Sequence, residues 1–194
     1  MITTMVPALV AFDERISYNI QHLVRVAPSA WKTLAIFGVY SMPIVLLWYW
    51  FARDRLTALR AAVAGIVAWF GFNTILSHFF VRERPPQLAV LHFPAHEFLF
   101  DRPGPSFPSD HAAFMTAVTL SFVLAGDRRL TPYLGALTAL TLLARVVTAQ
   151  HWVGDILVGI LVGVVAAVLV HTVRDPLDRL LLKPLIGLVG KVGL

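Results

Sequence analysis

Long apolar runs alternate with short polar segments along most of this chain. Five of these runs approach the length of about twenty residues that crosses the hydrocarbon core of a bilayer. They are residues 33–51, 58–80, 111–126, 131–149 and 152–173. The third run is short, and we expect its helix to begin as early as Ser109. The pattern predicts an all-α integral membrane helical bundle of five to six spans.

The two ends of the chain differ from these runs. Residues 8–26 place apolar side chains at helical spacing, which predicts an amphipathic N-terminal helix lying on the membrane surface. The alternative is a soluble flap packed on the rest of the chain. Residues 174–194 are interrupted by charges and prolines, and we interpret them as interfacial. We therefore predict a single membrane-embedded domain over residues 1–194, with a core of roughly 33–173 and interfacial segments at 1–30 and 174–194.

The composition agrees with a membrane protein. Hydrophobic residues make up 58% of the chain, charged residues 14%, and the mean hydropathy is +0.75. A soluble domain has about 45–50% apolar and about 25% charged residues. We attribute the modest net charge of +5 to loop arginines near lipid head groups, and expect no nucleic-acid partner. The absence of cysteine excludes disulfides and thiolate metal sites.

The unusual polar residues gather at one face if the spans alternate in direction. Four span ends then meet there, holding Arg82–Pro86, Ser106–His111, Arg145 and His151–Asp155. The opposite face carries Arg53, Arg55, Arg60, Arg128, Arg129, Arg174, Arg179, Lys183 and Lys191, although Arg15, Arg25, Lys32 and Arg102 lie with the polar cluster. The positive-inside rule makes the more basic face cytoplasmic, so we predict that the polar cluster faces outward.

His151 and Asp155 are four residues apart and share a face of a helix. The aspartate can hold one ring nitrogen and leave the other free as a nucleophile or base. Arg145 lies near the end of an apolar span, where an ionisable residue indicates a functional site. A purely structural ion pair between Arg145 and Asp155 is the alternative.

Two further segments offer groups for binding an anion. Ser109 or Asp110 can cap the helix of the third run, whose N-terminus attracts phosphate, and His111 lies in its first turn. Arg84, with Arg82 beside it, leaves the second span on the same face, and guanidinium groups suit tetrahedral oxyanions. Plain helix capping and ordinary head-group contacts are the alternatives.

Together these residues suit phosphoryl transfer. His151 would attack phosphorus, His111 would protonate the leaving oxygen, and the arginines would stabilise the charge on the equatorial oxygens. Water would then hydrolyse the phosphohistidine. Arg84 and Arg145 would repel a divalent cation, so we expect no metal and no cofactor.

Three motifs resemble those of the type-2 phosphatidic acid phosphatase superfamily, which shares its active site with vanadium haloperoxidases. The second motif, Pro-Ser-x-His, is present as residues 108–111. The third motif is Ser-Arg, five residues, His, three residues, Asp, and it is present at 144–155 with Ala144 in place of the serine. The first motif, Lys, six residues, Arg-Pro, retains only Arg84-Pro85, because Ser77 occupies the lysine position. Arg82 is a candidate substitute, and the resemblance covers roughly residues 60–170.

The resemblance implies a role for each matching residue. His151 would be the nucleophile, Asp155 its orienting partner and His111 the general acid, with no metal required. Phosphate would be bound by Arg84, Ser109 and Arg145. We add Asp110 and Arg82 to the candidate substrate-binding residues.

The short chain, Asn73 ahead of the Arg-Pro pair and the missing lysine resemble the bacterial undecaprenyl pyrophosphate phosphatase branch. That branch implies hydrolysis of undecaprenyl diphosphate outside the cytoplasmic (inner) membrane. The carrier lipid is thereby recycled for peptidoglycan and the cell wall, and the activity is linked to bacitracin resistance. Phosphatidylglycerophosphate, phosphatidic acid and lipid A phosphatases are alternatives within the enzyme class.

Other interpretations start from the same residues. A small transporter or anion conduit would line its path with the arginines, but its polar residues should be distributed through the spans. A vanadate-dependent peroxidase would share the site, but the membrane-embedded chain argues against it. Glu83, His92, His96, Glu97 and Asp101 in the long loop could adjust proton supply or head-group fit, or simply be solvated.

Overall fold

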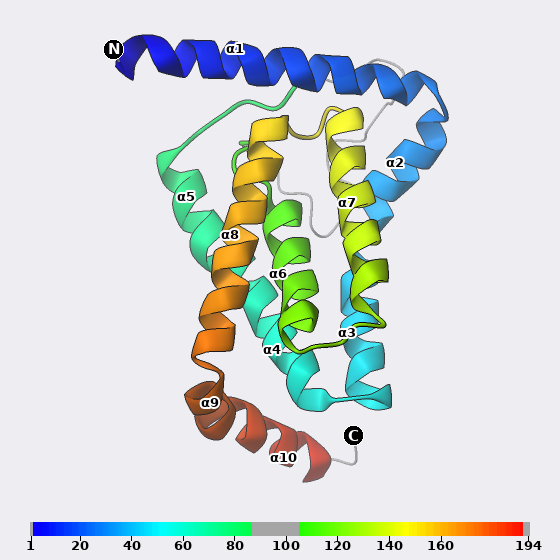
Figure 1. Ribbon diagram of the computed structural model, residues 1–194, viewed down its shortest axis with the longest axis vertical. Coiled ribbons are helices and arrows are strands. Elements are labelled where there is room, and N and C mark those ends of the chain that lie inside the picture. Colours follow the sequence, from blue (N-terminus) through cyan, green and yellow to red (C-terminus); the bar gives the residue numbers. More distant parts are fainter. Residues whose placement is uncertain (1, 87–104, 192–194) are drawn as a thin grey trace.

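The computed structural model describes residues 2–86 and 105–191, with side chains described from residue 7 onward (Figure 1). Within these ranges the chain is helical and has no strand, which confirms the predicted all-α membrane helical bundle. The elements of the bundle are α2 (Pro28–Phe37), α3 (Ser41–Ala52), α4 (Arg55–Ile66), the π-helical segment η2 (Val67–Asn73), α5 (Thr74–Phe79), α6 (Asp110–Leu124), α7 (Thr131–Val147) and α8 (Val153–Thr172). The loop positions His92, His96, Glu97 and Asp101 lie outside the described residues.

Each predicted apolar run corresponds to a helix or helix pair. By length and composition, α8 and the continuous helix formed by α4, η2 and α5 can each cross a membrane. The pair α2 and α3 meets the same criterion only when taken together, and α6 and α7 are apolar but shorter. The five runs are therefore present as a bundle, although their helices differ in length.

The first predicted span is not one straight helix. Between α2 and α3 the axis bends by 49°. Pro43 has no N–H to donate into a continuous helix, and the break falls just before it. Ser41 Oγ donates a hydrogen bond to Gly38 O at 2.5 Å, and Gly38 lies against Thr141 of α7 with no room for a side chain. The bend thus follows from proline chemistry and close packing, which apolar periodicity alone does not register.

Helix α6 lies at the centre of the bundle, in contact with α4, α7 and α8. Its alanines face the glycines of α8. A methyl group added at Gly159 would lie 2.6 Å from Ser109 O, and one at Gly163 would lie 2.5 Å from Ala113 O. Small residues on both sides let the two backbones approach closely, as at many membrane helix pairs.

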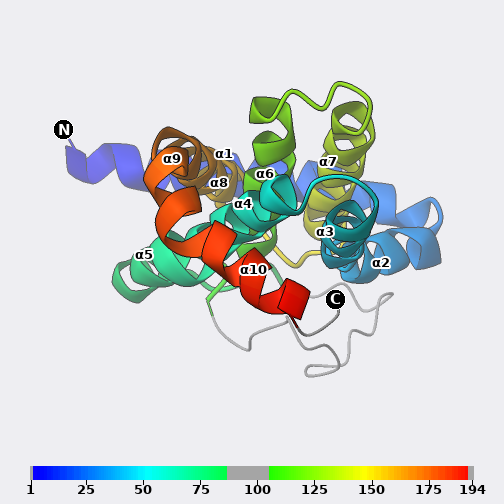
Figure 2. The same ribbon diagram turned by 90° about the horizontal axis from the view of Figure 1, so that it is seen from below.

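Two helical segments cover the ends of the bundle. Helix α1 (Ile2–Gln21) lies across one end, and α9 (Arg174–Leu177), η3 (Asp178–Leu182) and α10 (Lys183–Lys191) turn across the other (Figures 1 and 2). The predicted amphipathic segment at 8–26 corresponds to α1 and the short 3-10 turn η1 (His22–Arg25). Ser17 and Gln21 on α1 are buried, whereas Leu9 and Phe12 are more than half exposed. This exposed apolar surface is the feature expected of a helix at a membrane interface.

Candidate active site

The end of α7 and the start of α8 lie beneath α1, the start of α6 lies deeper in the bundle, and the segment that follows α5 runs back under α1 (Figure 1). The structure therefore brings together residues that are far apart in the sequence. His111, Arg145, His151, Ser109 and Asp155 are all buried in this region. Burial of so many polar groups in a membrane bundle requires that they bond to one another or to a ligand.

The turn between α7 and α8 positions Arg145 and His151. Ala149 adopts a left-handed backbone conformation with φ of 57°, which costs an alanine about 1 kcal/mol. The N–H groups of Gln150 and His151 both donate to Arg145 O, at 2.9 and 3.3 Å. This closure of the helix end brings the Arg145 guanidinium to the His151 ring, with 3.4 Å between Nη2 and Nε2.

The contacts of His151 define its tautomer. Its Nδ1 lies 2.9 Å from Ser106 O, and a carbonyl only accepts, so Nδ1 carries the hydrogen. Its Nε2 faces Arg145 Nη2, and a guanidinium only donates. Neutral His151 therefore has its lone pair on Nε2, on the side of the arginine. Asp155 Oδ2 is 3.7 Å from Nδ1, so the carboxylate faces the opposite side of the ring from the lone pair.

Burial lowers the pKa of His151 to about 4 from its usual 6.5. The nearby charges of Arg145 and Arg84 act in the same direction, while Asp155 opposes them. Both effects disfavour the imidazolium form. At neutral pH the ring is therefore uncharged and keeps the Nε2 lone pair that a nucleophile needs.

The start of α6 is held by residues from two other helices. Ser109 is its N-cap and accepts a hydrogen bond from Ala112 N at 3.3 Å, so of the two capping residues that the sequence offered, Ser109 and Asp110, the serine is the one that caps. Ser109 N in turn donates to Asp155 O at 3.1 Å. The His111 ring, in the first turn of the helix, lies with its centroid 6.3 Å from that of His151. The two imidazoles thus face a common space.

Asn73 is fully buried at the end of η2 and faces the same helix start. Its Nδ2 donates to Pro108 O at 3.0 Å and to Asp110 Oδ1 at 2.5 Å. Asp110, a predicted substrate-binding residue, therefore has one carboxylate oxygen bonded within the protein. A π-helical segment next to a functional site is a recurring feature of proteins.

The two arginines that follow α5 differ in their partners. Arg84 is half-buried, and its Nη1 donates to Gln150 O at 2.9 Å, directly before His151. Arg82 instead lies between two carboxylates, with Nη1 2.5 Å from Asp13 Oδ2 and 3.4 Å from Asp155 Oδ1. Ser77, at the lysine position of the first motif, donates only to Thr74 O of its own helix.

Several residues of the site were not predicted from the sequence. Ser106 holds the His151 ring through its carbonyl, and its own N–H donates to Arg82 O at 2.7 Å. Asp13 and Ser17 of α1 contact the start of α8, and Asn73 fixes the start of α6. Asn73 is a polar residue inside the apolar run 58–80, and this position was the sequence signal that could have marked it as part of the site. No comparable signal marks a backbone carbonyl such as that of Ser106.

A groove of about 690 Å³ opens beside the site, between α1 and the segment after α5. Its walls combine apolar and charged side chains from α1, from the segment after α5 and from the segment before α6. The apolar and aromatic ones are Val10, Tyr18, Phe80, Val81, Pro86, Phe107 and Trp152, and the charged ones are Glu14, Arg82, Glu83 and Arg84. Among the described residues, the site included, no cluster of three or more His, Asp or Glu side chains could hold a metal ion.

The chain belongs to the PAP2 superfamily, whose family model matches residues 56–179. This match covers the bundle from α4 to η3 and every predicted site residue. The protein is therefore a phosphohydrolase of this superfamily, with apolar helices that associate with membranes.

A more specific likeness is to the protein described as "Putative undecaprenyl-diphosphatase YbjG" of Escherichia coli (strain K12). The two are 26% identical over 162 residues, which are 78% of this chain and 79% of that protein. No solved structure matches the chain significantly.

Proposed function

We propose that the protein removes the terminal phosphate of undecaprenyl diphosphate, through a phosphohistidine on His151, at the outer face of a bacterial cytoplasmic membrane. The observation that carries this proposal is the His151 ring, buried and neutral, with its Nε2 lone pair beside the Arg145 guanidinium. A nucleophile so placed needs an electrophile with negatively charged oxygens, and a terminal phosphate meets that requirement.

The chemistry proceeds in two displacements. His151 Nε2 attacks the terminal phosphorus, the bond from phosphorus to the bridging oxygen breaks, and His111 gives its proton to that oxygen. Water then attacks the phosphohistidine, losing its proton to His111 as the phosphorus–nitrogen bond breaks. Inorganic phosphate and the lipid monophosphate are the products. Arg145, Arg84 and the N-terminus of α6 stabilise the charge on the phosphoryl oxygens in both steps, without a metal.

Two observations support a lipid substrate. The groove beside the site combines apolar walls with Arg82 and Arg84, a combination that suits a phosphate on a hydrocarbon chain, and Glu14 and Glu83 also line it. The similarity to an E. coli protein described as an undecaprenyl-diphosphatase favours a prenyl diphosphate over the other lipid phosphates. If this substrate is correct, expression of the active protein should raise bacitracin resistance.

The test is phosphate release by the purified protein in EDTA, from undecaprenyl diphosphate and from a panel of other lipid phosphates. The panel contains phosphatidylglycerophosphate, phosphatidic acid and lipid A. We expect the fastest release from undecaprenyl diphosphate, loss of activity in His151→Ala, and normal activity in His171→Ala, whose ring is on the far end of α8. Equal release by His151→Ala would reject the nucleophile, and preference for another lipid would reassign the substrate.

A further inference from the structure

The N-cap residue of helix α8 does not cap the helix with its own side chain. That residue is Trp152, which has no side-chain oxygen, yet the first N–H groups of a helix need acceptors. Helix α1 supplies two of them. Val153 N donates to Ser17 Oγ at 3.0 Å, and Gly154 N donates to Asp13 Oδ1 at 2.8 Å. Residues more than 130 positions upstream thus cap the helix that carries Asp155.

Asp13 also determines where Arg82 lies. Its Oδ2 accepts from Arg82 Nη1 at 2.5 Å, whereas Asp155 Oδ1 is 3.4 Å from the same nitrogen. Asp13 therefore holds the guanidinium closer to α1 than to Asp155. The other oxygen of Asp155 accepts from Trp152 N at 2.9 Å and lies 3.7 Å from His151 Nδ1. If Asp13 lost its charge, Asp155 would be the remaining carboxylate partner of Arg82 among the described residues. The guanidinium would then attract the Asp155 carboxylate away from His151.

The fit between α1 and α8 is close. A methyl group on Gly154 would lie 2.8 Å from Asp13 Oδ2, so the α1 side chain lies directly on the α8 backbone. Ser17 is fully buried, and the Tyr18 ring packs edge-on against Trp152 at 5.6 Å between centroids. Asp13 and Ser17 are four residues apart and so share one face of α1. This face is fitted to the start of α8.

We propose that Asp13 and Ser17 are positioning residues for catalysis, and that α1 must be seated on α8 for Asp155 to hold His151 correctly. The catalytic part of this proposal rests on the proposed function. Asp13 acts in two ways: its Oδ1 completes the first turn of α8, and its Oδ2 restrains Arg82. Ser17 acts only through the cap.

Two substitutions separate these roles. Asp13→Asn keeps an acceptor for Gly154 N but removes the charge that restrains Arg82, whereas Ser17→Ala removes only a cap bond. We expect Asp13→Asn to lower kcat about tenfold, with KM changed by less than about twofold, because the nucleophile is misaligned while phosphate binding is kept. In an Arg82→Gln background the same change should lower kcat by less than about twofold, since the two residues act as a pair. Arg15→Gln, on the exposed face of α1, is the control and should behave as wild type.

An equal loss of kcat from Asp13→Asn in both backgrounds would overturn the action through Arg82. Equal damage by Arg15→Gln would mean that α1 serves folding alone. Hydrogen exchange tests the cap without any substrate: Ser17→Ala should speed exchange of the Val153 amide, and Arg15→Gln should not. If wild-type protein hydrolyses no lipid phosphate, the proposed function fails. Unchanged protection of Val153 in Ser17→Ala would instead refute the capping role.

Discussion

His151 is neutral because the protein around it disfavours charge. Burial, together with the Arg145 and Arg84 charges, lowers its pKa to about 4. At pH 5.5 an ordinary histidine would be about 90% protonated, whereas His151 should be protonated in only about 3% of molecules. We expect the ring nitrogen NMR signals of His151 to show an unprotonated Nε2 down to about pH 5. A titration midpoint near the ordinary value of 6.5 would contradict this prediction.

The same shift affects stability. The unfolded chain binds a proton on this ring near the ordinary pKa of 6.5, but the folded protein does so only near a pKa of 4. Stability contributed by the neutral ring is therefore present above pH 6.5 and is lost as the pH falls toward 4. Thermal unfolding in detergent should show a smaller decrease in Tm over this window for His151→Gln than for wild type. A parallel decrease in both proteins would show that other groups govern acid unfolding.

At least two donors of Arg145 have partners among the described residues, and no single lysine ammonium can replace both. Its Nη1 donates to Ala35 O at 3.3 Å and its Nη2 faces His151 at 3.4 Å, with the side chain 1% exposed. A lysine has one compact ammonium in place of the planar fork. We expect Arg145→Lys to lower kcat about 100-fold, the scale of losing one donor to a transition-state oxyanion. Arg128→Lys, in the loop between α6 and α7, should leave kcat unchanged, and a fully active Arg145→Lys would contradict the assigned role.

At the scale of elements, the contact between α6 and α8 fixes the distance between the start of α6, the proposed phosphate-binding end, and the Asp155 carboxylate. A methyl group at Gly159 would meet Ser109 O and the Ala112 side chain. We expect Gly159→Ala to destabilise the protein by about 1–3 kcal/mol and to lower kcat, because α8 must move away from Ser109. Gly135→Ala, where an added methyl group meets nothing within 4 Å, is the matched control. Unchanged kcat and Tm in Gly159→Ala would contradict this prediction, because they would show that α6 and α8 can move apart without loss of stability or activity.

The helices and most of the site could be predicted because both rest on local patterns. Apolar runs of membrane length predicted each helix of the bundle, and fixed spacing predicted that Arg145, His151 and Asp155 would lie together. The bend at Gly38 depends on packing against Thr141, a contact across about a hundred residues that no local pattern encodes. The roles of Asp13 and Ser17 could not be predicted for the same reason. In the sequence, a polar residue on an amphipathic helix cannot be distinguished from one that simply faces water. Their role depends on which α8 amides they reach.

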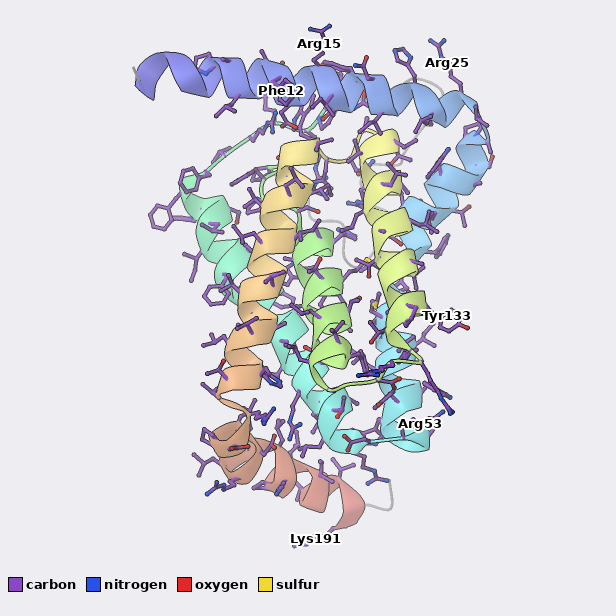
Figure 3. All side chains as sticks on the ribbon, in the orientation of Figure 1. Phe12, Arg15, Arg25, Arg53, Tyr133 and Lys191 are labelled. Carbon is purple, nitrogen blue, oxygen red and sulfur yellow. The ribbon has the colours of Figure 1, made fainter. Side chains whose placement is uncertain are left out.

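At the scale of the whole molecule, the two ends of the bundle differ in the residues that they carry. One end holds the candidate site beneath α1, and the other holds α9, α10 and many of the basic residues (Figure 3). Arg15 and Arg25 mark the first end, and Arg53 and Lys191 mark the second (Figure 3). From the positive-inside rule we propose that the second end faces the cytoplasm. A site at the first end could then reach a carrier lipid only on the outer surface of the membrane.

This orientation can be tested directly because the chain contains no cysteine. Single cysteines at Arg15 and Arg53 place one thiol at each end of the bundle, and the unsubstituted chain gives the background. We expect a membrane-impermeant maleimide to label Arg15→Cys in intact spheroplasts and Arg53→Cys only after lysis, provided that both variants still release phosphate. The reverse pattern would place the site in the cytoplasm. The enzyme would then act on lipid phosphates of the inner leaflet, and recycling from the outer surface would be excluded.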